Sequence, residues 1–225
     1  MWSYYGSKSK IAKIYPRPAH SLIIEPFAGA AWYSVMHRSK DVILNDKYAL
    51  IYGIWHWLIN QASPSVILEH SDFYEGDDIR HLPIDDAHKD LLGFCINRGS
   101  ATPCNIVQGW SCQVKSRPGW ASTTNYQLRR ISKLLPQIRH WSARCGDYRE
   151  LPDIEATWFI DPPYQHGGKC YQESAIDYLD LADWVSTRKG QVIVCENTKA
   201  DWLDFKPLTQ ITGQRVKTTE AIFYK

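Results

Sequence analysis

The sequence predicts an α/β fold in which the strands of one sheet alternate along the chain with helices. Two observations lead to this class. Short apolar runs recur along the chain, and segments with apolar residues at helical spacing separate them. With 225 residues and 44% hydrophobic composition, the chain can form one sizeable core, alone or with a small appended module.

The first two strands and helices follow one another closely. Residues 21–25 form an apolar run before a Pro-Phe-Ala-Gly turn, which predicts a strand, a tight turn and a helix over residues 31–38. Residues 41–45 predict a second strand that leads into Asp46. Residues 48–60 carry apolar side chains at helical spacing and predict the second helix.

The middle of the chain is divided by charge. Residues 65–90 contain eight acidic residues, whereas residues 91–146 contain none and carry eight cations. These cations are Arg98, Lys115, Arg117, Arg129, Arg130, Lys133, Arg139 and Arg144. Most charge runs are solvated faces. Because Trp110, Trp120 and Tyr126 are interleaved with the cations, this block favours a segment that binds nucleic acid.

The remaining elements continue the alternation. The acidic residues 65–90 can contain short helices, and the Gly, Pro, Ser and Thr content of residues 97–124 predicts a loop-rich insert. Residues 125–137 and 178–187 have helical spacing. Further strands are expected over residues 141–145, 156–160, 191–195 and 220–224.

The strand over residues 156–160 leads into Asp161-Pro162-Pro163-Tyr164, which is not an ordinary turn. The prolines fix φ and remove two backbone donors, so the carbonyls here are free to face a cleft beside a carboxylate and an aromatic ring. The carboxylate and the carbonyls can accept the hydrogens of a planar amino group, and the aromatic ring can stack on the ring that carries this amino group. The tetrapeptide alone is also typical of a Pro-Pro turn in which Asp161 caps and Tyr164 packs.

Four of the expected strands end beside an acid, namely Glu25, Asp46, Asp147 and Asp161. In open α/β sheets, ligands bind at the carboxyl ends of the strands. Four acids there predict a ligand with several donors, such as ribose hydroxyls, an adenine amino group and an ammonium. Since the chain has no G-x-x-x-x-G-K-[ST] phosphate loop, the expected ligand is a nucleoside without phosphates.

Taken together, these motifs resemble the Dam-like group of DNA adenine-N6 methyltransferases, in its α arrangement and over nearly the whole chain. The motifs that carry the resemblance are Tyr4-Tyr5-Gly6-Ser7-Lys8, Glu25-Pro26-Phe27-Ala28-Gly29-Ala30, Asn45-Asp46, Asp147-Tyr148 and Asp161-Pro162-Pro163-Tyr164. Each motif is weak alone, and the ordered set is specific. The chain departs from the group at Ala31, where a second glycine is frequent, and its recognition segment is short.

The resemblance implies a Rossmann-like sheet typical of methyltransferases that use S-adenosylmethionine. Residues 1–64 and 140–225 would form the catalytic domain, and residues 65–139 an inserted region that recognises DNA. The implied catalytic residues are Asp161, Pro162, Pro163 and Tyr164. The implied cofactor-binding residues are Tyr4, Tyr5, Lys8, Glu25, Pro26, Phe27, Ala28, Gly29, Ala30, Asp46, Asp147, Tyr148 and Asp161. The implied contacts to nucleic acid are Arg98, Lys115, Arg117, Arg129, Arg130 and Lys133.

The implied reaction moves a methyl group to the N6 amino group of an adenine that is flipped out of double-stranded DNA. It needs no metal ion. Three alternatives stay open: an RNA adenine acceptor, a cytosine N4 acceptor, or a module that binds cofactor or DNA without turnover.

The setting of such a protein is also an expectation. The six cysteines contain no C-x-x-C pair and are expected to be free thiols. No apolar run approaches the ~20 residues of a membrane span. We therefore expect a protein of the bacterial cytoplasm with no membrane partner, encoded by the host, a phage or a plasmid. The sequence leaves its oligomeric state open, with a monomer favoured, and the protein would act in a restriction-modification system or in another role of DNA methylation.

Overall fold

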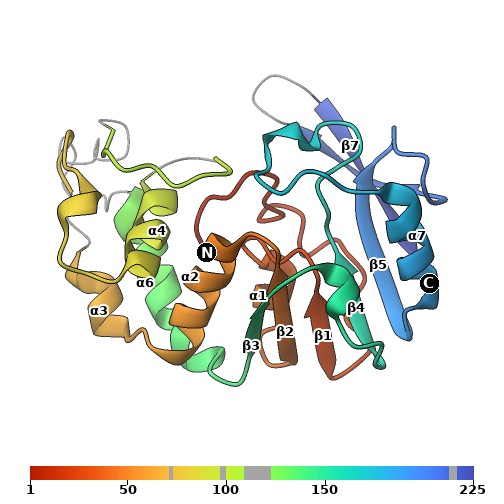
Figure 1. Cartoon of the computed structure of the whole chain (residues 1–225), viewed down its shortest axis with the longest axis horizontal. Coiled ribbons are helices and arrows are strands. Elements are labelled where there is room, and N and C mark those ends of the chain that lie inside the picture. Colours follow the sequence, from red (N-terminus) through yellow and green to blue (C-terminus); the bar gives the residue numbers. More distant parts are fainter. Residues whose placement is uncertain (71–72, 97–99, 109–122, 213–216) are drawn as a thin grey trace.

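The computed structural model describes residues 1–70, 73–96, 100–108, 123–212 and 217–225. A seven-stranded sheet with flanking helices forms one part of the molecule, and a group of helices lies beside it (Figure 1). The strands are β1 (Leu22–Glu25), β2 (Asp41–Asp46), β3 (Ser142–Cys145), β4 (Ala156–Ile160), β5 (Gly190–Asn197), β6 (Lys206–Thr212) and β7 (Lys217–Tyr224).

The strand order in the sheet is β3-β2-β1-β4-β5-β7-β6. The strands from β1 to β5 are parallel, and β7 lies antiparallel between β5 and β6. The chain builds outward from β1 through β2 to β3, then crosses to β4 on the other side of β1, which creates a topological switch point. The predicted α/β fold class, with a Rossmann-like sheet, is confirmed.

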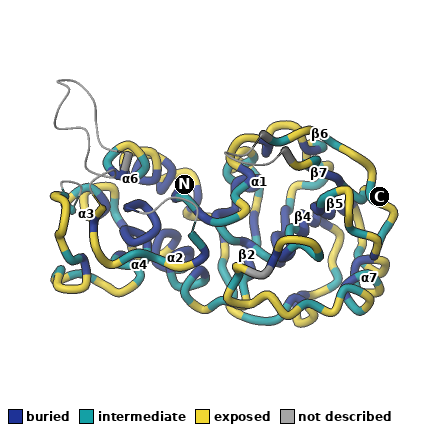
Figure 2. Tube along the Cα trace, turned by 90° about the horizontal axis from the view of Figure 1, so that it is seen from above, coloured by how far each residue is buried: buried dark blue, intermediate teal, exposed yellow. Residues whose placement is uncertain are grey.

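Each face of the sheet carries its own core, because successive side chains of a strand point to opposite sides. Ile23 and Phe159 belong to the core on one face, while Ile24 and Trp158 belong to the core on the other. Helices α1 (Trp32–Met36) and α2 (Ala49–Asn60) cover the first face, and α7 (Tyr178–Thr187) covers the second. The buried segments therefore run through the middle of the sheet (Figure 2).

The helices beside the sheet are α3 (Pro64–Glu69), α4 (Asp86–Cys95) and α6 (Thr123–Leu134), which we call the helical lobe. Their apolar side chains join the first core through residues such as Leu91, Phe94, Leu128 and Ile131. The predicted helix over residues 125–137 is present as α6, with a 3-10 turn over Leu135–Gln137 after it.

The structure differs from the sequence-based expectation in two elements, and a third expectation stays untested. Strand β6 was not predicted, because its sequence KPLTQIT is mostly polar and contains Pro207, which suits an edge strand. Helix α1 is shorter than expected, since Ala31 before it has φ 45° and His37 ends it. Most of the loop-rich insert expected over residues 97–124 lies outside the described residues.

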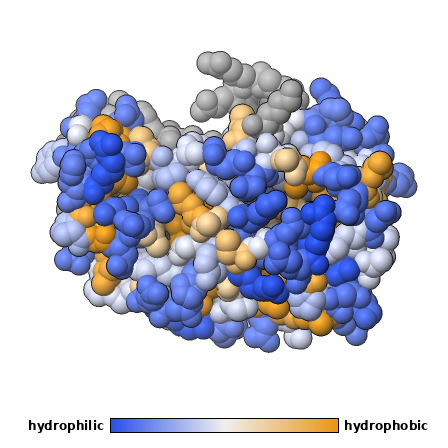
Figure 3. Space-filling model, in the orientation of Figure 1, coloured by the Kyte–Doolittle hydropathy of each residue, from blue (hydrophilic) through white to orange (hydrophobic). Residues whose placement is uncertain are grey.

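Polar side chains cover most of the face in Figure 3, and the apolar side chains form small separate groups. Among the described residues, no helix is both long and apolar enough to cross a membrane. The five cysteines in the described part of the chain are free thiols, as expected.

Arg139 shows that a cation of the basic block has a structural role. Its guanidinium donates to the carbonyl oxygens of Leu58 (3.0 Å), Ile59 (2.6 Å) and Ala62, at the end of α2. The last carbonyls of a helix have no partner within the helix. Arg139 supplies those partners and fixes the end of α2 to the segment before β3.

We predict that Arg139→Ala lowers the free energy of unfolding by about 1–3 kcal/mol, because hydrogen bonds from a charged donor are lost at the end of α2. Urea unfolding followed by circular dichroism measures the change. Lys133→Ala, which removes an exposed cation of the same block, is the matched control and should stay within about 0.5 kcal/mol of the native protein. Equal losses in the two variants would contradict the capping role.

Candidate functional site

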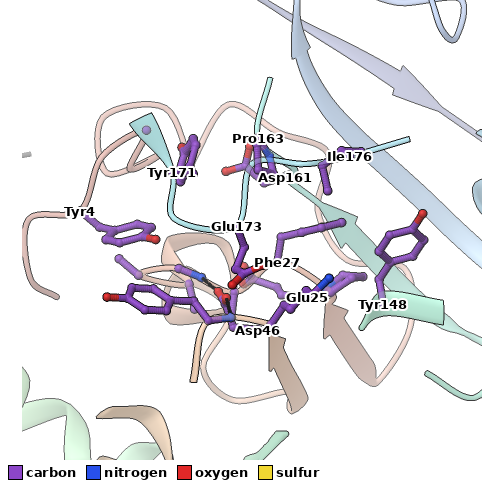
Figure 4. A pocket seen from close by; sticks show the side chains of 18 of the residues that line it. Tyr4, Glu25, Phe27, Asp46, Tyr148, Asp161, Pro163, Tyr171, Glu173 and Ile176 are labelled. Atoms are coloured by element: carbon purple, nitrogen blue, oxygen red, sulfur yellow. Dashed lines mark hydrogen bonds between the residues drawn. The ribbon is translucent and has the colours of Figure 1, made fainter. Parts of the chain in front are cut away.

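A cleft opens where the parallel strands β1, β2, β3 and β4 end at the same edge of the sheet (Figure 4). The N-terminal segment and residues 171–177 complete its walls. This is the edge at which the topological switch between β1 and β4 leaves a crevice for a ligand. All the residues expected to hold a cofactor line this cleft, although no observation tests their contact with one.

The turn after β1 is held by the end of β2. Asp46 accepts hydrogen bonds from the backbone N–H of Gly29 (2.9 Å) through one oxygen and of Tyr48 (3.0 Å) through the other. The side chain of Asn45 donates to the carbonyls of Pro26 (3.1 Å) and Gly146 (3.0 Å), so it joins the ends of β1, β2 and β3. A carboxylate oxygen has a second lone pair, so Asp46 can still accept from a ligand.

Two positions in this turn have left-handed backbone. Gly29 has φ 45°, and a Cβ there would lie 3.1 Å from the ring of Tyr4, so glycine lets that ring pack against the turn. Ala31 has φ 45° as well, which is unfavourable for a residue with a side chain. The group that the sequence resembles often has glycine at this position, and the backbone conformation gives the physical reason.

An aromatic wall lies on the side of β1 and β3. The ring of Phe27 lies 5.4 Å from that of Tyr148, whose hydroxyl donates to Asp180 (2.6 Å). Asp147 caps the short turn over Tyr148–Glu150 by accepting from the N–H of Arg149 (3.1 Å). Flat apolar surface with acids beside it can hold a heterocycle together with its sugar.

The tetrapeptide after β4 divides between the cleft and the interior. Asp161 and Pro163 line the cleft, whereas Pro162 and Tyr164 do not. The Pro163 carbonyl accepts from the hydroxyl of Tyr178 (2.8 Å). The Tyr164 hydroxyl donates to buried Glu220 of β7 (2.5 Å). Its own hydroxyl therefore holds the Tyr164 ring in place outside the lining of the cleft, and the stacking role expected for this ring stays a prediction.

Lys8 lies at the centre of the polar groups around Asp161. Its ammonium is 2.7 Å from a carboxylate oxygen of Asp161 and 4.6 Å from the centre of the Tyr164 ring. It also donates to the carbonyl of Gly6 (3.2 Å) and lies 4.0 Å from Glu220. Burial by itself lowers the pKa of Lys8, but Asp161 and Glu220 outweigh burial and raise the pKa above its usual value.

Three acids of the cleft have raised pKa values, and burial is the largest cause in each. Burial raises the pKa of Glu25 to about 8, although the backbone N–H of Ser34 donates to it (2.8 Å). The pKa of Asp46 rises to about 6 despite its two backbone hydrogen bonds, and that of Asp161 to about 6 despite Lys8. Desolvated carboxylates that face one cleft favour a cationic ligand, because it would stabilise their charged forms.

The segment that follows the tetrapeptide also faces these acids, and the sequence reasoning missed it. Tyr171, Glu173 and Ile176 line the cleft from above, and Glu173 points toward Asp46 (Figure 4). The Glu173 carboxylate contributes to the raised pKa of Asp46. No local pattern marks these residues, because their place depends on how the chain returns over the ends of the strands.

The residues expected to contact nucleic acid fall into two groups. Arg98, Lys115 and Arg117 lie outside the described residues. Arg129, Arg130 and Lys133 are exposed on α6. Arg129 donates to Asn125 (2.5 Å), and the guanidinium of Arg130 lies 5.1 Å from the ring of Trp32, which lines the cleft. The basic face of α6 therefore adjoins the cleft.

Comparisons with known proteins find distant structural similarities and no family. No family model matches the chain, and no curated protein matches it. One solved structure, titled "Putative methyltransferase yhhF from Escherichia coli", has 9% sequence identity over 89% of this chain and 74% of its own, with a TM-score of 0.34. Another, the rRNA methyltransferase aviRa from Streptomyces viridochromogenes, has 13% identity over 92% and 79%, with a TM-score of 0.37. Similarities this low identify no family, so the function has to be argued from the cleft.

We predict that Glu25→Gln stabilises the ligand-free protein, increasingly as the pH rises from about 4.5 to about 8. In this range the unfolded Glu25 is ionised, whereas burial keeps the folded residue protonated, so the native protein loses stability as the pH rises. The glutamine side chain carries no such charge, and its oxygen can still accept from the Ser34 N–H. Thermal unfolding at pH 5 and pH 8 measures the difference.

Glu150→Gln is the control for this prediction, since it removes an exposed acid near the same edge of the sheet. Its melting temperature should differ from that of the native protein by a similar amount at both pH values. The prediction fails if Glu25→Gln has the lower melting temperature of the two variants at pH 8.

Proposed function

We propose that this protein transfers a methyl group from S-adenosylmethionine to the N6 amino group of adenine in double-stranded DNA. The observation that carries the proposal is the position of Asp161 and Pro163. They follow the central strand β4 and lie at the same cleft as the acids that end β1, β2 and β3.

The chemistry of the cleft fits S-adenosylmethionine, which supplies a methyl group activated by a sulfonium charge when it is bound. Asp46 offers acceptors for ribose hydroxyls at the end of β2, and Phe27 offers a ring face for the adenine. Glu173 adds negative charge for the cationic groups of the cofactor, and buried Glu25 would ionise when such a group lies beside it. Gly29 lets the ring of Tyr4 pack against the turn as part of the cleft wall.

The residues after β4 would act on the amino group of the target base. Its nitrogen is a weak nucleophile, because its lone pair is delocalised into the ring. Asp161 can accept one amino hydrogen, and the Pro163 carbonyl, which lines the cleft and accepts from Tyr178, has a second lone pair for the other. These hydrogen bonds strengthen as the nitrogen gains positive charge, so they favour the transition state over the ground state. The amino nitrogen must lie in line with the bond from the sulfonium sulfur to the methyl group, so the rate then depends on how the base and the cofactor are positioned.

The helical lobe is the proposed recognition region. Its exposed cations Arg129 and Lys133 can contact phosphates, and α6 adjoins the cleft through the contact between Arg130 and Trp32. Flipping a base out of the duplex costs a few kcal/mol, which phosphate contacts beside the cleft would offset. Assays on matched DNA and RNA oligonucleotides with adenine or cytosine as the only acceptor distinguish this proposal from the RNA and cytosine alternatives.

We predict that Asp161→Asn lowers the rate of methyl transfer at least ~100-fold, by analogy with the loss of a group that stabilises developing charge. The side-chain oxygen of asparagine can still accept from Lys8, so the fold should be kept, and the lost charge should weaken cofactor binding much less than it lowers the rate. Transfer of labelled methyl groups to duplex DNA measures the rate, and calorimetry measures the affinity. Asp183→Ala, an exposed acid of α7, is the control. A folded Asp161→Asn protein with near-native turnover would refute the assigned role.

We predict that the double substitution of Arg129 and Lys133 by alanine weakens binding to every DNA sequence and reduces the salt slope by about 1–2 units, since each phosphate contact contributes about 0.9. Fluorescence anisotropy at several salt concentrations measures both effects. Substitution of Lys189 and Lys225, at the opposite edge of the sheet, is the charge-matched control. If the two double variants have equal slopes, the basic face of α6 is only solvated.

A further inference from the structure

The Lys8 ammonium has no role in the mechanism described so far, yet it is one of the most buried charges in the described structure, with 8% of its side chain exposed. Its shortest ion pair is the 2.7 Å contact with one oxygen of Asp161, Oδ1. It lies at 4.0 Å from Glu220, so Asp161 is its closer carboxylate partner. A buried charge this close to an acid strongly affects that acid.

The backbone around Lys8 holds the ammonium in this position. The Lys8 carbonyl accepts from the N–H groups of Ile11 (2.9 Å) and Ala12 (2.8 Å), which forms a tight turn. Before this turn, Gly6 has φ 70°, and a Cβ there would meet the hydroxyl oxygen of Tyr171 at 1.9 Å. That hydroxyl donates to the Tyr5 carbonyl (3.2 Å), so the N-terminal segment is clamped against the loop that follows the tetrapeptide.

Lys8 is the one cation among the described charges that act on the Asp161 carboxylate. The other titratable groups that interact with this carboxylate are acids, thiols and phenols from the elements packed around Asp161. They are Glu25 of β1, Cys195 and Glu196 of β5, Glu220 of β7, and Tyr15, Tyr164 and Tyr171 of the adjoining loops. Glu220 and Glu196 raise the pKa of Asp161, as burial does, whereas Lys8 lowers it. Lys8 therefore opposes every other influence on this acid.

We propose that Lys8 is a positioning residue for the catalytic acid: it holds Oδ1 of Asp161 and keeps the carboxylate ionised, which leaves Oδ2 as the acceptor for the amino group of the target base. The inference rests on the proposed function, because it assigns Lys8 to that same site.

The chemical reason lies in the two forms of a carboxyl group. An ionised carboxylate only accepts hydrogen bonds, whereas a protonated one carries an O–H donor. An amino group that is gaining positive charge needs an acceptor, so protonated Asp161 would be inactive. With the pKa of Asp161 at about 6, most of the protein is in the active form at neutral pH. Without Lys8, burial and the neighbouring acids would make the protonated form dominant.

The test compares the pH dependence of two variants with opposite effects on charge. Lys8→Gln removes the cation but keeps a hydrogen-bond donor, and Glu220→Gln removes an anion but keeps an acceptor for Tyr15 and Tyr164. Lys8→Arg keeps the cation and is the control. One readout is kcat/KM for methyl transfer to duplex DNA between pH 5 and pH 9. The other is the ¹³C titration of the Asp161 carboxyl in ligand-free protein, assigned with Asp161→Asn.

We expect the acid limb of the native profile near pH 6. Lys8→Gln should move it upward by about 1–3 pH units, with activity largely recovered at pH 9. Lys8→Arg should keep the acid limb near its native pH whatever its overall rate, because the cation is retained, and Glu220→Gln should move the limb downward. The same shifts should be present in the ¹³C titration.

The inference is overturned if Lys8→Gln lowers activity equally at every pH and leaves the ¹³C titration in place, because Lys8 would then have a purely structural role. If Lys8→Gln does not fold, an unshifted titration in Glu220→Gln overturns it, since the acid would not respond to the charges beside it. If the native protein transfers no methyl group, the proposed function fails, and the ¹³C titration still decides whether Lys8 controls the ionisation of Asp161.

Discussion

The parallel pairing of β1 with β2 on one side and β4 on the other is the constraint on which the rest of the structure depends. β1 has only four residues and lies in the middle of the sheet, so its carboxyl end adjoins those of both neighbours. This pairing brings Glu25, Asp46 and Asp161 to one cleft although they are far apart in the sequence. A one-residue shift in the register of one strand would move its acid away from the other acids. Such a shift would also turn every side chain of that strand to the opposite face of the sheet.

Bringing acids together in a buried place has an electrostatic cost, and the surrounding groups show how the fold offsets it. Backbone N–H groups donate to Asp46 and Glu25, Lys8 pairs with Asp161, and two tyrosine hydroxyls donate to Glu220. The compensation is incomplete, since the pKa values of the cleft acids stay raised. The charged forms of these acids are therefore disfavoured in the ligand-free protein, and a cationic ligand would stabilise them. The cleft thereby trades stability for selectivity toward such a ligand.

The N-terminal segment connects this cleft to the helical lobe. The hydroxyl of Ser3 accepts from Gln127 of α6 (3.3 Å), and the centre of the Tyr4 ring lies 5.5 Å from that of Phe94 in α4. A few residues later the same segment places Lys8 beside Asp161. One short stretch therefore contacts the lobe proposed to bind DNA and the residues proposed to act on the base. A movement of the helical lobe would therefore shift Lys8 and its contact with Asp161 through this segment.

Local sequence determined the α/β class, most strands and helices, and the part of the cleft lining that follows the ends of the strands, because strand periodicity and turn residues are local properties. The tertiary structure alone decided which groups meet those residues: the pairing of Lys8 with Asp161, the tyrosine hydroxyls on Glu220, the place of Glu173 above Asp46, and the capping of α2 by Arg139. The polar edge strand β6 also depends on its pairing with β7 rather than on its own pattern. Contacts between residues distant in sequence follow from the path of the whole chain, which no single motif encodes.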